Sequence, residues 1–143
     1  MSGKVTVLGN ASQYAGATGQ GGMLVIKGNA SSRCGISMKG INIVVGGNIG
    51  HSSAFMAQAG NLLVLGNAGN GLGDSIYEAN IFVAGAVGEL GADCVEKEMR
   101  EEHVGLVEKL LDESQITDRP RRFKRYGSAR KLYHFDIKNV GLY

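Results

Sequence analysis

Residues 62–68 read Leu-Leu-Val-Leu-Gly-Asn-Ala, a short apolar run closed by glycine, asparagine and alanine. The same arrangement returns along most of the chain at a constant spacing of 19 residues, without an insertion. Its anchor glycines are Gly9, Gly28, Gly47, Gly66 and Gly85. Such regular spacing indicates a repeat architecture in which each unit forms one turn.

The apolar run before each anchor glycine has the properties of a β-strand. It is rich in Val, Ile and Leu, and the glycine ends it. Two of its positions are aliphatic in every copy and lie two residues apart, so their side chains point to the same face. We expect them to form two inward ladders: Val5, Leu24, Ile43, Leu62 and Ile81, and Val7, Ile26, Val45, Val64 and Val83.

A unit of 19 residues excludes two common repeat folds. It is too short for a strand–helix–strand unit, which needs about 30 residues, and it lacks the leucine pattern of leucine-rich repeats. An all-β, single-stranded solenoid remains, in which each strand pairs with its copy about 4.8 Å away in the next turn. We predict a right-handed parallel β-helix, the hand following the general crossover preference.

Small residues mark the corners of this coil. We expect the anchor glycines to be structural and to supply the positive φ that a corner requires. A second small column, seven residues after each anchor, suits a tight corner: Gly16, Gly35, Ala54, Gly73 and Ala92.

The column between the two inward ladders should face outward, yet it is mostly apolar: Thr6, Val25, Val44, Leu63 and Phe82. A strand that is apolar on both faces is normally covered on both. The cover is either the tail of this chain or another subunit, so Phe82 is a candidate interface residue.

Charge divides the 143-residue chain into two parts. Residues 1–92 carry four basic and three acidic side chains, and the remaining 51 residues carry eleven and ten. We therefore assign residues 1–94 to the β-helix and residues 95–143 to a C-terminal capping helix and tail. The net charge of +2 indicates no particular partner. No apolar run reaches the about 18 residues of a membrane span, and without an export signal a cytoplasmic location is expected.

The C-terminal part begins with helical periodicity over residues 95–113. Asp93 and Glu96 have the spacing of an N-terminal capping box. We expect this helix to lie across the outward apolar column and to shield the last strand edge, as a solenoid cap does.

A basic segment follows at residues 119–131, where seven of 13 residues are basic and none is acidic. Interleaved aromatic residues give it some likeness to a nucleic-acid patch. The near-neutral chain favours instead an extended tail that is solvated or docks on an acidic partner, with no nucleic acid involved. Its candidate interface residues are Arg121, Arg122, Lys124 and Arg125. Residues 132–137 alternate between apolar and polar and predict one more strand.

No constellation of catalytic, cofactor-binding or metal-binding residues emerges. Cys34 and Cys94 lie three turns apart, about 14 Å along the axis at about 4.8 Å per turn, beyond the about 7 Å that a disulfide spans. We expect two buried free thiols. His51 lies in a corner beside serines, without an orienting acid, so we expect a surface or interface residue.

The repeats resemble those of the GXGXG family, whose β-helix forms the C-terminal domain of the glutamate synthase large chain. The most telling string is Gly-Asn-Ala-Ser-Ser-Arg-Cys-Gly-Ile-Ser-Met-Lys-Gly at 28–40. Together with residues 51–58, 73–79, 91–97 and 126–133, it is similar to the stand-alone β-helix subunits of N-methylglutamate synthases, also called methylamine–glutamate N-methyltransferases. The likeness covers nearly the whole chain.

This resemblance implies a non-catalytic scaffold subunit of an FMN-dependent, glutamate-synthase-like oxidoreductase or amidotransferase complex. The partners it implies are an amidotransferase-like subunit and an FMN-binding glutamate-synthase-like subunit, so no cofactor is expected in this chain. Family members carry further turns before the position of Ser2. Here the first strand at Val5 follows Met1 closely, and we expect a bare edge that invites a homo-oligomer.

Two other functions stay open. One is a part similar to the GXGXG-type subunit of formylmethanofuran dehydrogenase, which the tail motif disfavours. The other is a self-assembling structural solenoid. The sequence favours a non-catalytic subunit over a chain with enzymatic activity of its own.

Overall fold

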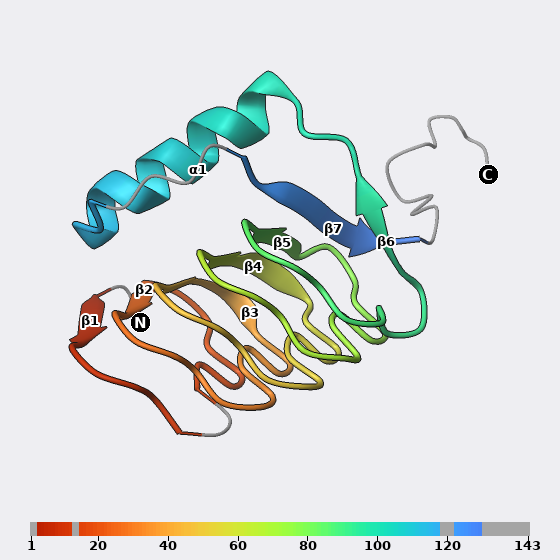
Figure 1. Cartoon of the computed structure of the whole chain (residues 1–143), viewed down its shortest axis with the longest axis horizontal. Helices are drawn as coiled ribbons and strands as arrows, with labels where there is room; N and C mark the ends of the chain where they lie inside the picture. The colour runs from red at the N-terminus through yellow and green to blue at the C-terminus, as the bar shows by residue number, and fades with distance from the viewer. Residues whose placement is uncertain (1–2, 13–14, 118–121, 130–143) are drawn as a thin grey trace.

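The computed structural model describes residues 3–12, 15–117 and 122–129. Its body is a parallel β-helix, as predicted. Five strands stack side by side in chain order (Figure 1): β1 (Lys4–Val7), β2 (Met23–Ile26), β3 (Lys39–Val45), β4 (Ala59–Val64) and β5 (Asn80–Val83). Each strand pairs with its copy 19 residues later, as Leu24 with Ile43 and Leu62 with Ile81 show.

The inward ladders predicted from the repeat form the core of the coil, except in the first turn, where Val5 is 48% exposed. Ile43, Leu62 and Ile81 are fully buried, and so is the neighbouring ladder at Ile26, Val45 and Val64. Each such side chain contributes about 1.5–3 kcal/mol by leaving water. The stacked aliphatic columns therefore hold successive turns together where strand hydrogen bonds alone would be weak.

The anchor glycines are structural, but the reason predicted for them was wrong. None of the anchor glycines has a positive φ, which occurs at other positions that include four of the second small column: Gly16 (71°), Gly35 (73°), Ala54 (60°) and Gly73 (72°).

The anchor glycines make room for a surface ladder of asparagines. The Oδ1 of Asn29 accepts a hydrogen bond from the backbone N–H of Asn48 at 2.7 Å, and that of Asn48 accepts one from Asn67 at 2.7 Å. A Cβ atom on Gly47 would collide with Asn29 Oδ1 and approach the Gly28 carbonyl oxygen to 3.0 Å. Gly28, Gly66 and Gly85 meet the same obstacle, whereas Gly9 has no neighbour within 4 Å.

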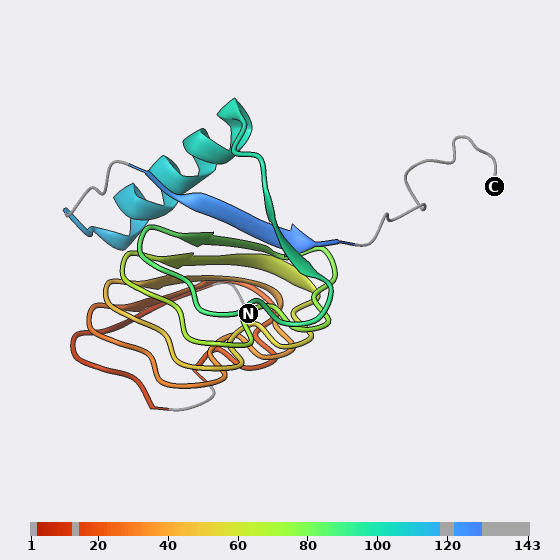
Figure 2. The same ribbon diagram turned by 45° about the vertical axis from the view of Figure 1, so that its right-hand side comes forward.

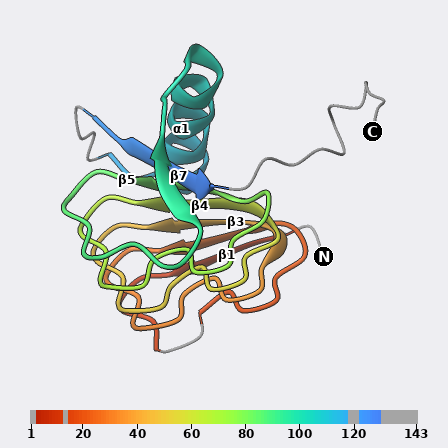
Figure 3. The same ribbon diagram turned by 90° about the vertical axis from the view of Figure 1, so that its right-hand side faces the viewer.

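The outward apolar column is covered by the tail of this chain. Helix α1 (Glu101–Ser114) lies on the outer side of the strand face (Figures 2 and 3). Val25, Val44, Leu63 and Phe82 are fully buried and form one cluster with the helical residues Val107, Leu110 and Leu111. The helix thus lies where the sequence predicted.

The helix begins later than predicted. Residues 95–97, expected in its first turn, belong to strand β6 (Cys94–Lys97), and Asp93 adopts a left-handed φ of 65° instead of capping the helix. The backbone of β6 finds partners in a strand from the tail, which the local pattern does not reveal. Arg100 is the residue before the first helical turn.

The basic segment contributes strand β7 (Lys124–Ser128) rather than an extended arm over those residues. It inserts antiparallel between β5 and β6, pairing Phe82 with Arg125 and Lys97 with Arg125. β7, and not the helix, therefore shields the edge of β5. The sheet order is β1-β2-β3-β4-β5-β7-β6. Residues 132–137, predicted as a strand, lie outside the described residues.

Candidate functional site

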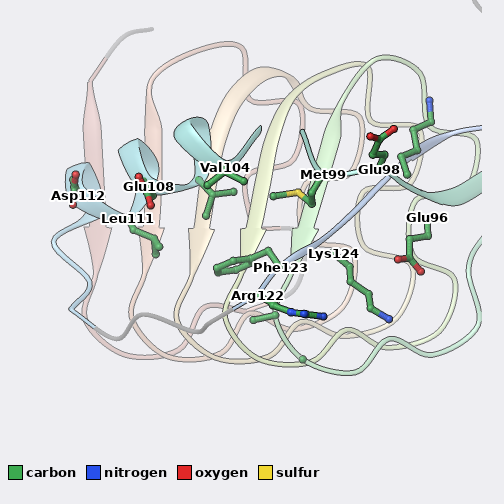
Figure 4. A pocket seen from close by; sticks show the side chains of 14 residues that line it. Glu96, Glu98, Met99, Val104, Glu108, Leu111, Asp112, Arg122, Phe123 and Lys124 are labelled. Atoms are coloured by element: carbon green, nitrogen blue, oxygen red, sulfur yellow. The ribbon is translucent and has the colours of Figure 1, made fainter. Parts of the chain in front are cut away.

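A groove of about 940 Å³ runs between α1 and the chain that enters β7 (Figure 4). One wall is α1, the other is the segment 122–124, and residues 96–99 close one end. The groove exists because α1 lies flat on the strand face while β7 pairs with the end of the coil. Two elements from the tail are therefore held apart by the coil itself.

The floor of the groove is apolar. Val107 and Leu111 face the coil and are almost fully buried, while Val104 on the same helix is 46% exposed. Met99 and Phe123 are half-buried beside them and pack against the cluster under the helix. The apolar surface of the groove thus continues the core beneath α1.

The two walls carry opposite charges. Glu108 and Asp112 project from α1, and Arg122 and Lys124 stand on the facing wall (Figure 4). Among the described residues, an ion pair joins Arg100 to Glu98, and none joins Glu108 to Arg122 or Lys124. Exposed opposite charges beside an apolar floor are suited to contact with another protein segment.

Arg125, predicted as an interface residue, is used inside this chain. A half-buried amide ladder runs from Asn80 to Asn61 at 3.3 Å and from Asn61 to Asn42 at 2.9 Å. Arg125 donates from Nη1 to Asn80 Oδ1 at 3.3 Å and from Nε to the Glu98 carbonyl at 2.9 Å. Its guanidinium thus closes the ladder and ties β7 to the segment before α1. Burial lowers the pKa of Arg125.

Both ends of α1 are fixed by side chains. The Arg100 backbone N–H donates to His103 Nδ1 at 3.1 Å. At the other end, Lys27 Nζ donates to the Ser114 carbonyl and Lys4 Nζ to the Glu113 carbonyl, both at 2.9 Å. The last turn has no basic residue of its own, so lysines of the coil complement the negative end of the helix dipole.

His103 was not recognised in the sequence, because histidine is an unusual residue for a helix cap. Its side chain is buried, with its ring centroid 6.2 Å from that of Phe82. Burial, and secondarily the charge of Arg125, lowers its pKa below the ordinary 6.5. Since Nδ1 accepts the Arg100 N–H, the neutral ring carries its proton on Nε2.

The other predicted interface residues lie in different surroundings. His51 is exposed in its corner, with Nδ1 3.4 Å from Ser52 Oγ, and does not line the groove. Phe82 is fully buried under α1 and presents no surface to another chain. Arg122 and Lys124 are brought together in the groove. Arg121 lies outside the described residues.

Both cysteines are buried free thiols, as predicted. Burial raises the pKa of Cys34 to about 12. Burial and the nearby Asp74 carboxylate raise that of Cys94 to about 11. Over the ranges that the structure describes, no group of three or more His, Cys, Asp or Glu side chains is placed to hold a metal ion. In the same ranges, no helix is long and apolar enough to cross a membrane.

Comparison with known proteins gives one partial likeness. A segment of 58 residues is 67% identical to Protein GlxC of Rhizobium meliloti (strain 1021). The match covers 40% of this chain and 25% of that protein, so the chain matches about a quarter of its curated relative. No protein-family model and no solved structure matches the chain. This chain therefore shares a stretch of closely similar sequence with a longer protein.

Proposed function

We propose that this chain is a non-catalytic scaffold subunit of an FMN-dependent, glutamate-synthase-like complex that makes glutamate or N-methylglutamate. The observation that carries the proposal is the likeness of its 19-residue repeats to the GXGXG β-helix, above all at residues 28–40. The parallel β-helix formed by those repeats is consistent with it. The partial match to Protein GlxC adds that such sequence occurs within a larger protein.

In this proposal the chemistry belongs to two partners. An amidotransferase-like subunit releases ammonia, and an FMN-binding glutamate-synthase-like subunit uses it or an amine. The β-helix holds them in a fixed relation, in the cytoplasm. A rigid coil suits that role because its side chains are engaged in stacking between turns.

The groove between α1 and residues 122–124 is the surface that we assign to partner contact. Its apolar floor offers area that a partner can remove from water. Its oppositely charged walls, Glu108 on one side and Lys124 on the other, would set the orientation of the partner. This contact is expected to involve Arg122 and Lys124, and not Phe82.

The test is a pulldown of the tagged chain from its native cells, with flavin absorbance measured on the eluate. We expect an amidotransferase-like protein and a yellow FMN-binding protein to co-elute. Lys124→Glu and Glu108→Lys should weaken that co-elution. Lys39→Glu and Glu89→Lys, exposed positions outside the groove, serve as matched controls. Equal retention by groove and control variants would exclude the groove as the contact surface.

A self-assembling solenoid is the second candidate. It is favoured by the two outer edges of the described sheet, at β1 and β6, which pair with other described strands on one side only. Such edges template pairing with another chain. Light scattering of the isolated chain over a range of concentrations distinguishes the two candidates, because only self-assembly raises the mass with concentration.

A further inference from the structure

His103 occupies an unusual position for a titratable side chain. It lies in the first turn of α1, is only 9% exposed, and packs against Phe82 on β5. Its Nδ1 accepts the Arg100 backbone N–H, one of the donors that the start of a helix leaves without an intrahelical partner. The neutral ring therefore caps α1 and also covers the end of the outward apolar column.

We propose that His103 is a pH-sensitive latch, which holds the first turn of α1 over Phe82 when neutral and releases that turn when protonated. A protonated Nδ1 carries a hydrogen and cannot accept the Arg100 N–H. The two N–H groups would then face each other at the 3.1 Å that now separates the nitrogens. Protonation would therefore remove the cap of α1 and also drive the His103 ring out of its buried position.

The charges around the ring favour the neutral form on balance. Arg125 on β7 and Arg100 before the helix oppose a positive charge on His103. Glu98 before the helix and Glu102 on α1 favour it, and Glu102 Oε2 lies 3.7 Å from His103 Nε2. Both carboxylates are on exposed side chains, where water weakens their effect. The positive end of the helix dipole also disfavours a positive charge on His103.

The pH range follows from the direction of this shift. The folded protein holds the His103 proton less tightly than the unfolded chain, whose pKa is near 6.5. Well above pH 6.5, protonation of His103 makes no contribution to opening. As the pH falls from there toward the lower pKa of the folded state, each proton taken up favours opening. Within that window the equilibrium constant for opening rises by at most about tenfold per pH unit, the limit for one proton.

Opening would expose a specific surface. Phe82, Leu63 and Val44 lie in one row beneath α1, and Phe82 is the member nearest its first turn through its contact with His103. Release of that turn would uncover Phe82 first. The latch would thus turn a closed face of the coil into an apolar surface under acid conditions.

The experiment is amide hydrogen exchange of the full chain across pH 5 to 8 (about 1.5 pH units on either side of the ordinary histidine value), corrected for intrinsic exchange. We expect protection of the amides in the first turn of α1 to fall as the pH drops below 6.5, by at most about tenfold per pH unit. In His103→Gln the dependence should vanish, since glutamine at this position can still reach the backbone N–H but does not titrate. His51→Gln, at an exposed histidine, should behave like the unmodified protein.

Two results would overturn the latch. One is protection of the first turn that does not change with pH in the unmodified protein. The other is a pH dependence that persists in His103→Gln. If that variant does not fold, NMR titration of the His103 ring in the unmodified chain decides. A pKa below 6.5 supports the latch and one above it refutes it.

Discussion

Replacing Gly47 by alanine tests why the anchor column is glycine. The new Cβ would displace Asn29 Oδ1, which accepts the Asn48 N–H, and would meet the fixed carbonyl of Gly28 at 3.0 Å. Loss of an exposed hydrogen bond costs about 0.5–1.5 kcal/mol, and overpacking adds about 1–3 kcal/mol. Alanine restricts the unfolded chain more than glycine does, and this raises the free energy of unfolding by about 0.4–1 kcal/mol. We expect Gly47→Ala to lower the free energy of unfolding by about 0.5–4 kcal/mol.

The matched control lies in the same column. Gly9 has no atom within 4 Å of a built Cβ and no left-handed φ. Gly9→Ala should therefore be neutral or stabilise by up to about 1 kcal/mol. Urea unfolding followed by circular dichroism gives both values, provided that the slope m is unchanged.

A double-mutant cycle between two adjacent turns makes the test stricter. Asn29→Ala removes the side chain that a Cβ on Gly47 would strike. Gly47→Ala should therefore cost less in the Asn29→Ala background than alone. Strictly additive costs, or equal destabilisation by Gly9→Ala and Gly47→Ala, would refute the explanation by close approach.

Three further predictions concern single positions. Gly105→Ala should raise the free energy of unfolding by up to about 1 kcal/mol, because this helical glycine has open space around it; thermal unfolding checks this, and a loss would contradict it. Arg125→Ala should destabilise by about 1–3 kcal/mol because Asn80 and the Glu98 carbonyl lose a charged donor, while Arg125→Lys should restore little, since one ammonium lacks the guanidinium fork. Cys34, whose thiol is fully buried with a pKa raised to about 12, should react with iodoacetamide only on unfolding; rapid labelling of the folded chain at pH near 8 (about the pKa of a free thiol) would disprove its burial.

The body of the coil could be predicted because its information is local and repeated. Each strand pairs with its own copy, so the register of Ile43 with Leu62 follows from the 19-residue spacing alone. The apolar outward column also indicated correctly that a second layer covers it. The helical periodicity also predicted correctly that a helix lies on that column, but it did not predict the residue at which the helix begins.

The cap at the end of the coil could not be predicted, because it rests on one non-repeating contact. β7 is antiparallel and joins β5 to β6, and nothing in the periodicity marks such a partner. The stretch that begins at residue 95 was therefore wrongly predicted to be helical, whereas its first residues belong to β6. Similarly, Arg125 looked like a free basic residue until the amide ladder ending at Asn80 was placed beside it.

The role of the anchor glycines was misjudged for a related reason. A glycine that avoids a collision and one that adopts a left-handed φ look alike in sequence. Only the position of Asn29 in the preceding turn distinguishes them at Gly47. His103 likewise acquires its role from Phe82 and from the Arg100 backbone, neither of which its own identity suggests.

The central claim is that the β-helix assembles with catalytic partners, and native mass spectrometry of the purified native complex tests it most directly. We expect a particle that contains this chain, an amidotransferase-like subunit and an FMN-binding subunit, with the flavin mass lost only together with the latter. A particle built of this chain alone, or flavin that stays with this chain after the others dissociate, would contradict the scaffold function.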